Sequence, residues 1–307
     1  MCAAIDGVTV GGFAFSLKES SGSARIWALD VLHRDLGNVT GLARVEFARR
    51  RPALPAEQLV PIPLAVHGQY AFKGVRAAVE ERFGIADKKL CWDMLASDHV
   101  PFNLFVPMRD QPWSVELICG WVGDHVARVT GIHIEWAPAP ATSFLDDNTS
   151  FDAYITYDTS SGERGAIGIE TKFTEGPYSW GATEKLRMFD EGSAYVRLTR
   201  SSKLYGAHAL DALRTPKLKQ LWRNQLLGEA MKQRSLVDEF ISVIVFPSGN
   251  THYASASTAH HELMAPEARG RFVPVTFEAL FTRLRTLCET AEAKAWLGYL
   301  ERRYVVP

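Results

Sequence analysis

The sequence lacks a long uninterrupted apolar run, and no basic segment precedes one near Met1, so we expect neither a membrane span nor a signal peptide. Cysteine is scarce, and the four copies are far apart: Cys2, Cys91, Cys119 and Cys288. None forms a C-x-x-C pair, which argues against a zinc ribbon or a disulfide framework. Unpaired thiols fit a reducing compartment, and we expect a cytoplasmic protein.

Nucleotide-binding and zinc-protease signatures are also missing. The chain has no G-x-x-x-x-G-K-[ST] sequence and no G-x-G-x-x-G after a strand. The run His260-His261-Glu262-Leu263-Met264 does not match H-E-x-x-H, which argues against a zincin. His125 and His133 lack a recognisable third ligand and stay unassigned.

A strong overall charge is absent too, because the net charge is −1 over 307 residues. The charge is unevenly distributed, however. The segment from Val196 to Arg234 contains two acidic residues, Asp211 and Glu229, and nine basic ones, a net charge of +7: Arg197, Arg200, Lys203, Arg214, Lys217, Lys219, Arg223, Lys232 and Arg234. We expect the segment Arg197–Arg234 to attract nucleic acid, with a solvated charged face as the alternative. A second basic cluster comprises Arg44, Arg49, Arg50 and Arg51.

Two short segments with alternating polarity are the most informative feature present. In Phe151–Tyr157 and in Ala166–Phe173, apolar residues alternate with polar or small ones. This period of two predicts two strands that each bury one face. The polar and glycine-containing residues between them, 158–165, predict a turn, and hence a hairpin.

The hairpin register can be predicted from the position of the turn. A turn centred on Ser161 places Tyr157 opposite Gly165 and Asp152 opposite Glu170. Opposed residues have Cβ atoms about 5 Å apart, and like charges there are unfavourable unless a cation lies between them. The register therefore predicts a metal site.

An ordinary exposed strand is the alternative, because the tripeptide Glu170-Thr171-Lys172 is short. The chain supplies its own comparison in Glu292-Ala293-Lys294, which has the same pattern in a predicted helix. Residues two apart do not share a helix face, so we expect that copy to be ordinary surface. The strand pattern around Glu170-Thr171-Lys172 and the presence of Asp152 favour the interpretation that this first copy belongs to a functional site.

The remaining pattern predicts an α/β protein with a mixed sheet flanked by helices. We expect helices and strands in the order helix, three strands, helix, strand, followed by two C-terminal helices. An earlier helix is predicted near Gly74–Phe83, and the stretch between the hairpin and the basic helix is expected to be irregular. The predicted segments are a helix from Pro112, a strand at Val129–Trp136, the hairpin, a helix at Lys217–Gln233, a strand at Phe240–Phe246, and helices at Phe277–Thr286 and Ala291–Arg302.

Two polar residues on the predicted helices are candidates for the site. On a helical wheel, Gln225 lies within the apolar arc of Leu221, Trp222 and Leu226, so we expect it to face the sheet. A buried amide needs polar partners, either a ligand or groups of the protein. Glu116 lies about 60° outside the apolar arc of its helix and could lean over the sheet edge or be exposed.

Asp152, then Glu170-Thr171-Lys172, then a helix bearing Gln225 resemble the PD-(D/E)XK nuclease superfamily. The resemblance covers Pro112 to Asn250, and Phe151 replaces the proline that names the motif. The segment Ser97–Phe105 is similar to the sequence that precedes the core of restriction endonucleases. The resemblance implies a restriction-endonuclease-like αβββαβ core, with N-terminal and C-terminal helical elaborations.

The resemblance also implies a chemistry. Asp152, Glu170 and the Thr171 carbonyl would hold Mg²⁺, for which Mn²⁺ could substitute, with Glu116 as an additional carboxylate. Lys172 would orient a water or stabilise negative charge, and Gln225 would steady the site. Asp146 and Asp147 are spare acids near Asp152.

We therefore expect a Mg²⁺-dependent endonuclease of restriction or defence type that acts on DNA. The alternatives are a catalytically silent nuclease-fold protein that binds nucleic acid, and a protein in which the carboxylates are structural. We divide the chain into an N-terminal extension of unknown role, 1–111, and a nuclease-like domain, 112–307. A homodimer would suit double-strand cutting.

Overall fold

The computed structural model describes residues 8–10, 13–15, 72, 74–83, 97–173 and 175–305. The chain divides into two compact units, which are described separately. The sheet unit comprises Met108–Thr171 and Gly176–Thr276, and the terminal unit comprises Met1–Pro107, Lys172–Glu175 and Phe277–Pro307. The predicted boundary at residue 111 stays a prediction. In the part of the chain that is described, no helix has the length and apolarity to cross a bilayer.

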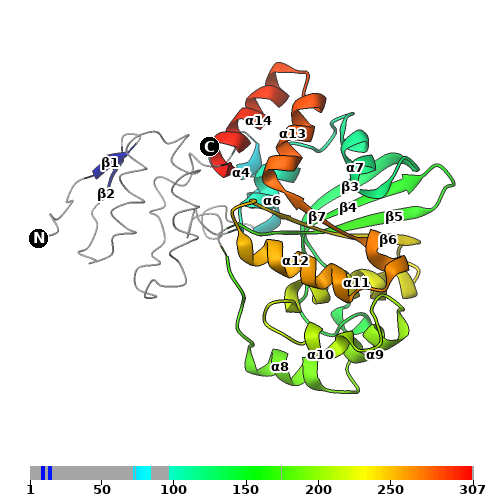
Figure 1. The fold of residues 1–307 in the computed structure, drawn as a ribbon. Helices are drawn as coiled ribbons and strands as arrows, with labels where there is room; N and C mark the ends of the chain where they lie inside the picture. The colour runs from blue at the N-terminus through cyan, green and yellow to red at the C-terminus, as the bar shows by residue number, and fades with distance from the viewer. Residues whose placement is uncertain are drawn as a thin grey trace, which may run out of the picture. The chain divides into compact units, whose positions relative to one another are not determined.

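A mixed five-stranded sheet is the centre of the sheet unit (Figure 1), with the order β3-β4-β5-β6-β7. The first three strands are antiparallel, and β5, β6 and β7 are parallel to one another. Their bounds are β3 (Val126–Trp136), β4 (Phe151–Thr159), β5 (Arg164–Thr171), β6 (Glu239–Phe246) and β7 (Phe272–Thr276). The predicted α/β fold with a restriction-endonuclease-like core is confirmed.

Strand β7 was not predicted from the sequence. It is short and contains Pro274, a residue that cannot donate a backbone hydrogen bond and is therefore disfavoured inside a sheet. The structure places β7 at the sheet edge, where proline is tolerated.

Helices flank this sheet (Figure 1). Helix α7 packs against β3, whereas α11 packs against β5 and β6. The prediction that the stretch between β5 and α11 is irregular is wrong, because it contains three short helices. The helices of the sheet unit are α7 (Ser114–Val122), α8 (Ala182–Phe189), α9 (Ala194–Ser201), α10 (Ala209–Leu213), α11 (Lys219–Gln233) and α12 (Thr251–Leu263), with 3-10 turns η3 (Ala141–Ser143) and η4 (Pro266–Arg271).

Helix α12 was also missed, because its alanine- and serine-rich sequence has no clear apolar stripe. Its start is fixed locally by Asn250, whose side-chain oxygen accepts a hydrogen bond from the Tyr253 N–H at 3.1 Å. Asparagine at this position satisfies a backbone donor that the helix itself leaves without a partner.

Glycine allows α11 to lie close to the sheet. A Cβ atom built on Gly228 would come within 2.0 Å of the Phe240 ring, and one on Gly168 within 2.4 Å of Phe151. The rings of Phe151 and Phe240 pack with centroids 5.5 Å apart. Only glycine fits at these two positions, so the sequence sets a short distance between helix and strand.

The terminal unit contains the two-stranded antiparallel sheet of β1 (Val8–Val10) and β2 (Phe13–Phe15). Its helices are α4 (Val75–Phe83), α6 (Val100–Phe105), α13 (Phe277–Leu287) and α14 (Ala291–Tyr304). The predicted helices near residues 74–83, 277–286 and 291–302 are confirmed. The basic cluster Arg44, Arg49, Arg50 and Arg51 lies outside the described residues.

Helix α6 lies within the segment Ser97–Phe105 and is anchored by a buried asparagine. Asn103 donates to the Tyr304 hydroxyl at 2.9 Å, and its side-chain oxygen accepts from the Phe72 N–H at 3.1 Å. The Trp296 indole N–H donates to the Asn103 carbonyl at 2.8 Å. These contacts give the segment a structural role, because burying a polar group without a partner lowers the stability of the fold.

His260, from the run that does not match a zincin, is completely buried on α12. Its Nε2 lies 3.0 Å from the Tyr205 hydroxyl, and its ring packs against Phe272. Burial lowers the pKa of His260 to about 3, with a smaller effect of His261. The fold therefore favours the neutral imidazole.

This burial predicts a pH-dependent stability. Because the unfolded pKa is near 6.5, the stabilisation is complete above that pH and is lost as the pH falls toward 3, by about 1.4 kcal/mol per pH unit. We expect His260→Phe to lower the free energy of unfolding at pH 7.5, since the Tyr205 hydroxyl loses its partner, but to flatten its decline between pH 6.5 and 4.5. Urea denaturation at several pH values measures both effects. His208→Ala, at an exposed histidine, should keep the wild-type slope, and an unchanged slope in His260→Phe would contradict the assignment.

Candidate functional site

The β4–β5 hairpin has the predicted register. Ala153 pairs with Ile169, and the ladder continues to Asp158 opposite Arg164. Asp152 and Glu170 each lie one residue beyond Ala153 and Ile169. They therefore share the end of the sheet at which β4 begins and β5 ends.

Asp152 is held by the residue that follows Glu170. Its Oδ2 accepts hydrogen bonds from the Thr171 N–H at 2.7 Å and from the Thr171 hydroxyl at 2.8 Å. The sequence predicted the Thr171 carbonyl as a metal ligand. It did not predict that the Thr171 N–H and hydroxyl group would bind Asp152. Two donors on one carboxylate oxygen fix its orientation.

Glu170 is held by a side chain of α11. The carboxylate is 3% exposed, and its Oε2 accepts a hydrogen bond from Asn224 Nδ2 at 2.6 Å. The sequence prediction missed Asn224, because the helical wheel places it about 60° outside the predicted apolar arc. Its position directly before Gln225, on a helix expected to cover β5, is the signal that could have found it.

Two consecutive residues of α11, Asn224 and Gln225, have buried side-chain oxygen atoms without partners among the described residues. Gln225 is 1% exposed, so the prediction that it faces inward is confirmed. Its Oε1 and the Oδ1 of Asn224 are both buried and have no hydrogen-bond partner among the described residues. The Asn224 oxygen belongs to the amide that contacts Glu170. An oxygen acceptor beside a carboxylate favours a donor or a cation between them.

Lys172 directly follows Thr171 at the end of β5 and is 5% exposed. Lys172 belongs to the terminal unit, and it is connected to Asp152 and Glu170 through its position in the sequence. The comparison tripeptide behaves as predicted, because Glu292 and Lys294 are exposed on α14.

Glu116 lies in the first turn of α7, which packs against β3, two strands from β5. Its charge acts on Cys119, whose thiol pKa is raised mainly by burial and further by Asp124 and Glu116. Within the described residues, no three His, Cys, Asp or Glu side chains gather in an arrangement that could hold a metal ion. The structure thus supplies a carboxylate pair, and the role of Glu116 stays a prediction.

Of the two spare acids, Asp147 has structural partners. It accepts hydrogen bonds from the Tyr195 hydroxyl and from the Thr149 N–H, the latter at 2.8 Å, and Arg223 lies 3.5 Å away. Arg223 also donates to the Thr149 hydroxyl at 2.7 Å. Asp147 therefore fixes the loop that leads into β4.

Arg223 connects this loop to α8. It donates to Glu184 at 2.6 Å, and the buried Lys219 donates to the same carboxylate at 2.8 Å. Burial alone would raise the pKa of Glu184, but the hydrogen bonds from Lys219 and Gly181 and the charge of Arg223 lower it overall. The three charged side chains fasten α8 to α11.

These contacts change the interpretation of the basic segment. Arg200 and Arg214 both bind Glu191, so four of the nine basic residues face carboxylates from outside the segment. Counting Asp147, Glu184 and Glu191 reduces the local charge from +7 to +4. The segment is less electropositive than its sequence alone suggests.

The fold and the carboxylate pair at one end of the sheet are those of a restriction-endonuclease-like protein. A family model described as the PD-(D/E)XK nuclease superfamily matches residues 68–306, and the chain belongs to this superfamily. No curated protein and no solved structure matches the chain. Membership indicates nuclease activity and a nucleic-acid substrate at the level of the superfamily.

Proposed function

We propose that this protein is a Mg²⁺-dependent endonuclease that hydrolyses DNA, of restriction or defence type. The observation that carries the proposal is the pair of oriented carboxylates at one end of the sheet, Asp152 bound by Thr171 and Glu170 bound by Asn224. The intracellular location expected from the cysteine pattern is part of the same proposal.

The donor set fits a divalent metal ion. Asp152, Glu170 and the Thr171 carbonyl offer the oxygen ligands that Mg²⁺ prefers, and Mn²⁺ accepts the same set. The buried, unpartnered Oδ1 of Asn224 supports a cation or its bound water at this place. Bound there, the metal ion would supply a water of lowered pKa and neutralise charge on the phosphate.

The protein's own residues supply the remaining functions. Lys172 directly follows Thr171 in the chain, and we assign to it the stabilisation of the negative charge that develops on the phosphate. Thr171 and Asn224 would hold the two carboxylates in fixed orientations, which avoids reorganisation during the reaction. Gln225 would contact substrate or the hydration shell. Glu116 remains a candidate additional ligand.

Metal dependence tests the proposal directly. We expect purified protein to cut plasmid, linear duplex or single-stranded DNA in Mg²⁺ or Mn²⁺, and to lose all cleavage in EDTA. Readdition of Mg²⁺ should restore the activity, because EDTA removes the ion without changing the chain. Gel electrophoresis of the products measures cleavage.

The other outcomes separate the alternatives. Salt-sensitive binding of DNA without cleavage in any metal would favour a catalytically silent binding protein, since phosphate contacts weaken as salt rises. Neither binding nor cleavage would assign the carboxylate pair a structural role. Sedimentation of the active species would test the proposed homodimer.

A further inference from the structure

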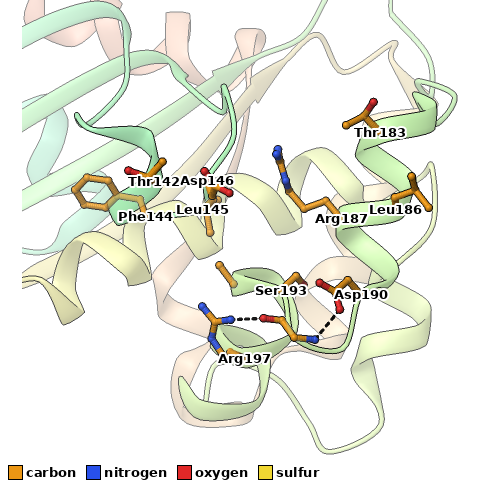
Figure 2. A pocket seen from close by; sticks show the side chains of 12 residues that line it. Thr142, Phe144, Leu145, Asp146, Thr183, Leu186, Arg187, Asp190, Ser193 and Arg197 are labelled. Carbon is orange, nitrogen blue, oxygen red and sulfur yellow. Dashed lines mark hydrogen bonds between the residues drawn. The ribbon is translucent and has the colours of Figure 1, made fainter.

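A pocket of about 740 Å³ lies within the sheet unit, outside the carboxylate pair. Its walls come from the segment before β4 and from α8, α9 and the residues between them (Figure 2). The lining combines two guanidinium groups, several hydroxyl and carboxylate groups, and an apolar part that includes Phe144, Leu145 and Leu186. This volume is within the range of pockets that bind small organic ligands.

The pocket contains a cationic group without a partner. Arg187 is half-buried and has no hydrogen bond or ion pair to any described residue. Figure 2 shows it extending from α8 toward the segment that carries Leu145 and Asp146. A guanidinium that is partly desolvated and unpaired favours an anion, because its lost hydration is otherwise not replaced.

Two other charged groups of the lining, Arg197 and Asp190, have partners in the turn between α8 and α9, and Asp146 supplies a further carboxylate. Arg197 donates to the Gly192 carbonyl, and Asp190 accepts from the Gly192 N–H at 2.9 Å. Both contacts shape the turn between α8 and α9 (Figure 2). Arg187 is therefore the basic group of the lining most available to a ligand, and it extends toward the segment of Leu145 and Asp146 (Figure 2).

The pocket is attached to the same end of the sheet as the carboxylates. Residues 142–146 lead into β4, which begins beside Asp152, and α8 follows the end of β5, which carries Glu170. Arg223 binds both wall segments through Thr149 and Glu184. Its neighbour Asn224 binds Glu170, so one helix fixes the pocket walls and the carboxylate.

We propose that this pocket receives one unpaired nucleotide of the DNA strand that the carboxylate site cleaves. The phosphate would bind Arg187, and the sugar and base would lie against apolar residues of the lining, among them Leu186. A base inside a duplex is stacked on both faces and cannot enter a pocket without leaving the helix. The inference rests on the proposed function and specifies its substrate as DNA with single-stranded character.

Binding of two DNA probes tests the proposal on the full chain. The probes are a fluorescein-labelled single-stranded 20-mer and the matched duplex, measured by fluorescence anisotropy in EDTA so that no cleavage occurs. We expect tighter binding of the single strand, and we expect Arg187→Gln to weaken that binding by about five- to tenfold, the loss of one charge-assisted contact. Lys185→Gln makes the same charge change on an exposed residue of α8 that does not line the pocket, and it should stay within about twofold of wild type.

An abasic probe tests whether a base occupies the pocket. A single-stranded 20-mer with one abasic nucleotide at successive positions should bind wild type more weakly at one position. In Leu186→Ser this difference should disappear, because the exposed Leu186 side chain no longer contacts the base. Circular dichroism melting of each variant checks that the fold is retained.

The outcomes separate this inference from the proposed function. Wild-type cleavage with equal single-strand and duplex affinity, and unchanged binding by Arg187→Gln, would overturn the pocket inference and leave the nuclease intact. A loss with Arg187→Gln but no abasic effect would limit the pocket to a phosphate and refute the nucleotide. Absence of metal-dependent cleavage by wild type would instead refute the proposed function.

Discussion

Replacement of Lys172 by alanine is expected to reduce DNA cleavage by at least about 100-fold, while binding of DNA in EDTA falls much less. The physical reason is that the ammonium group would act on charge that develops in the transition state, and one such group contributes about 10²–10³ in rate. Single-turnover cleavage in Mg²⁺ measures the effect at saturating protein. Lys172→Arg should recover little activity, because its larger guanidinium places the charge differently.

Lys294→Ala is the matched control for this substitution. It removes a lysine from the same Glu-x-Lys pattern at an exposed position of α14, where we expect wild-type cleavage. Thermal melting should accompany both variants, because Lys172 is buried and its loss can also affect stability. A folded Lys172→Ala protein with wild-type cleavage would show that Glu170-Thr171-Lys172 is not the catalytic motif.

Asn224→Asp is expected to cause the second large loss of cleavage. The new carboxylate would lie about 2.6 Å from Glu170, where two negative charges cannot coexist without a cation. If one of them retains a proton, the pair keeps the total charge of −1 found in wild type, but Glu170 loses its fixed amide donor and shares its negative charge with the new acid. Asn224→Leu keeps the side-chain size but removes the donor, and it should lower cleavage by about 10- to 100-fold, since a hydrogen bond to a charged group contributes about 1.5–3 kcal/mol.

Metal binding gives a readout that does not depend on turnover. Calorimetric titration with Mn²⁺ should show weaker binding to Asn224→Leu than to wild type, because Glu170 loses its fixed orientation. Gln220→Leu makes a similar change on the same helix at a half-buried position and should bind Mn²⁺ normally. Equal Mn²⁺ affinity and equal cleavage in wild type and Asn224→Leu would remove Asn224 from the site.

The sequence predicted the centre of the fold because local signals agree there. Alternation in β4 and β5, with a glycine-containing turn between them, determined both the strands and their register. Gln225 was recognised as buried because it lies among large apolar residues on a regular helix. These features depend on neighbours within one turn or one hairpin, which sequence periodicity reports directly.

The parts that escaped prediction depend on distant residues. Asn224 has no sequence signal of its own, and its contact with Glu170 requires the close approach of α11 that Gly228 permits. The basic segment was judged from its own residues, whereas its partners Glu184 and Glu191 precede it in the chain. Pairing across such separations is set by tertiary packing and not by local pattern.

Consecutive residues of α11 fasten the two halves of the site, Arg223 at Thr149 before β4 and Asn224 at the end of β5. Side chains of successive helical residues diverge by about 100°, so a rotation of the helix that improves one contact must break the other. The two hydrogen bonds can therefore form together at only one rotation of α11 about its axis. A variant that rotates this helix is therefore expected to disturb Glu170 and the loop before β4 together.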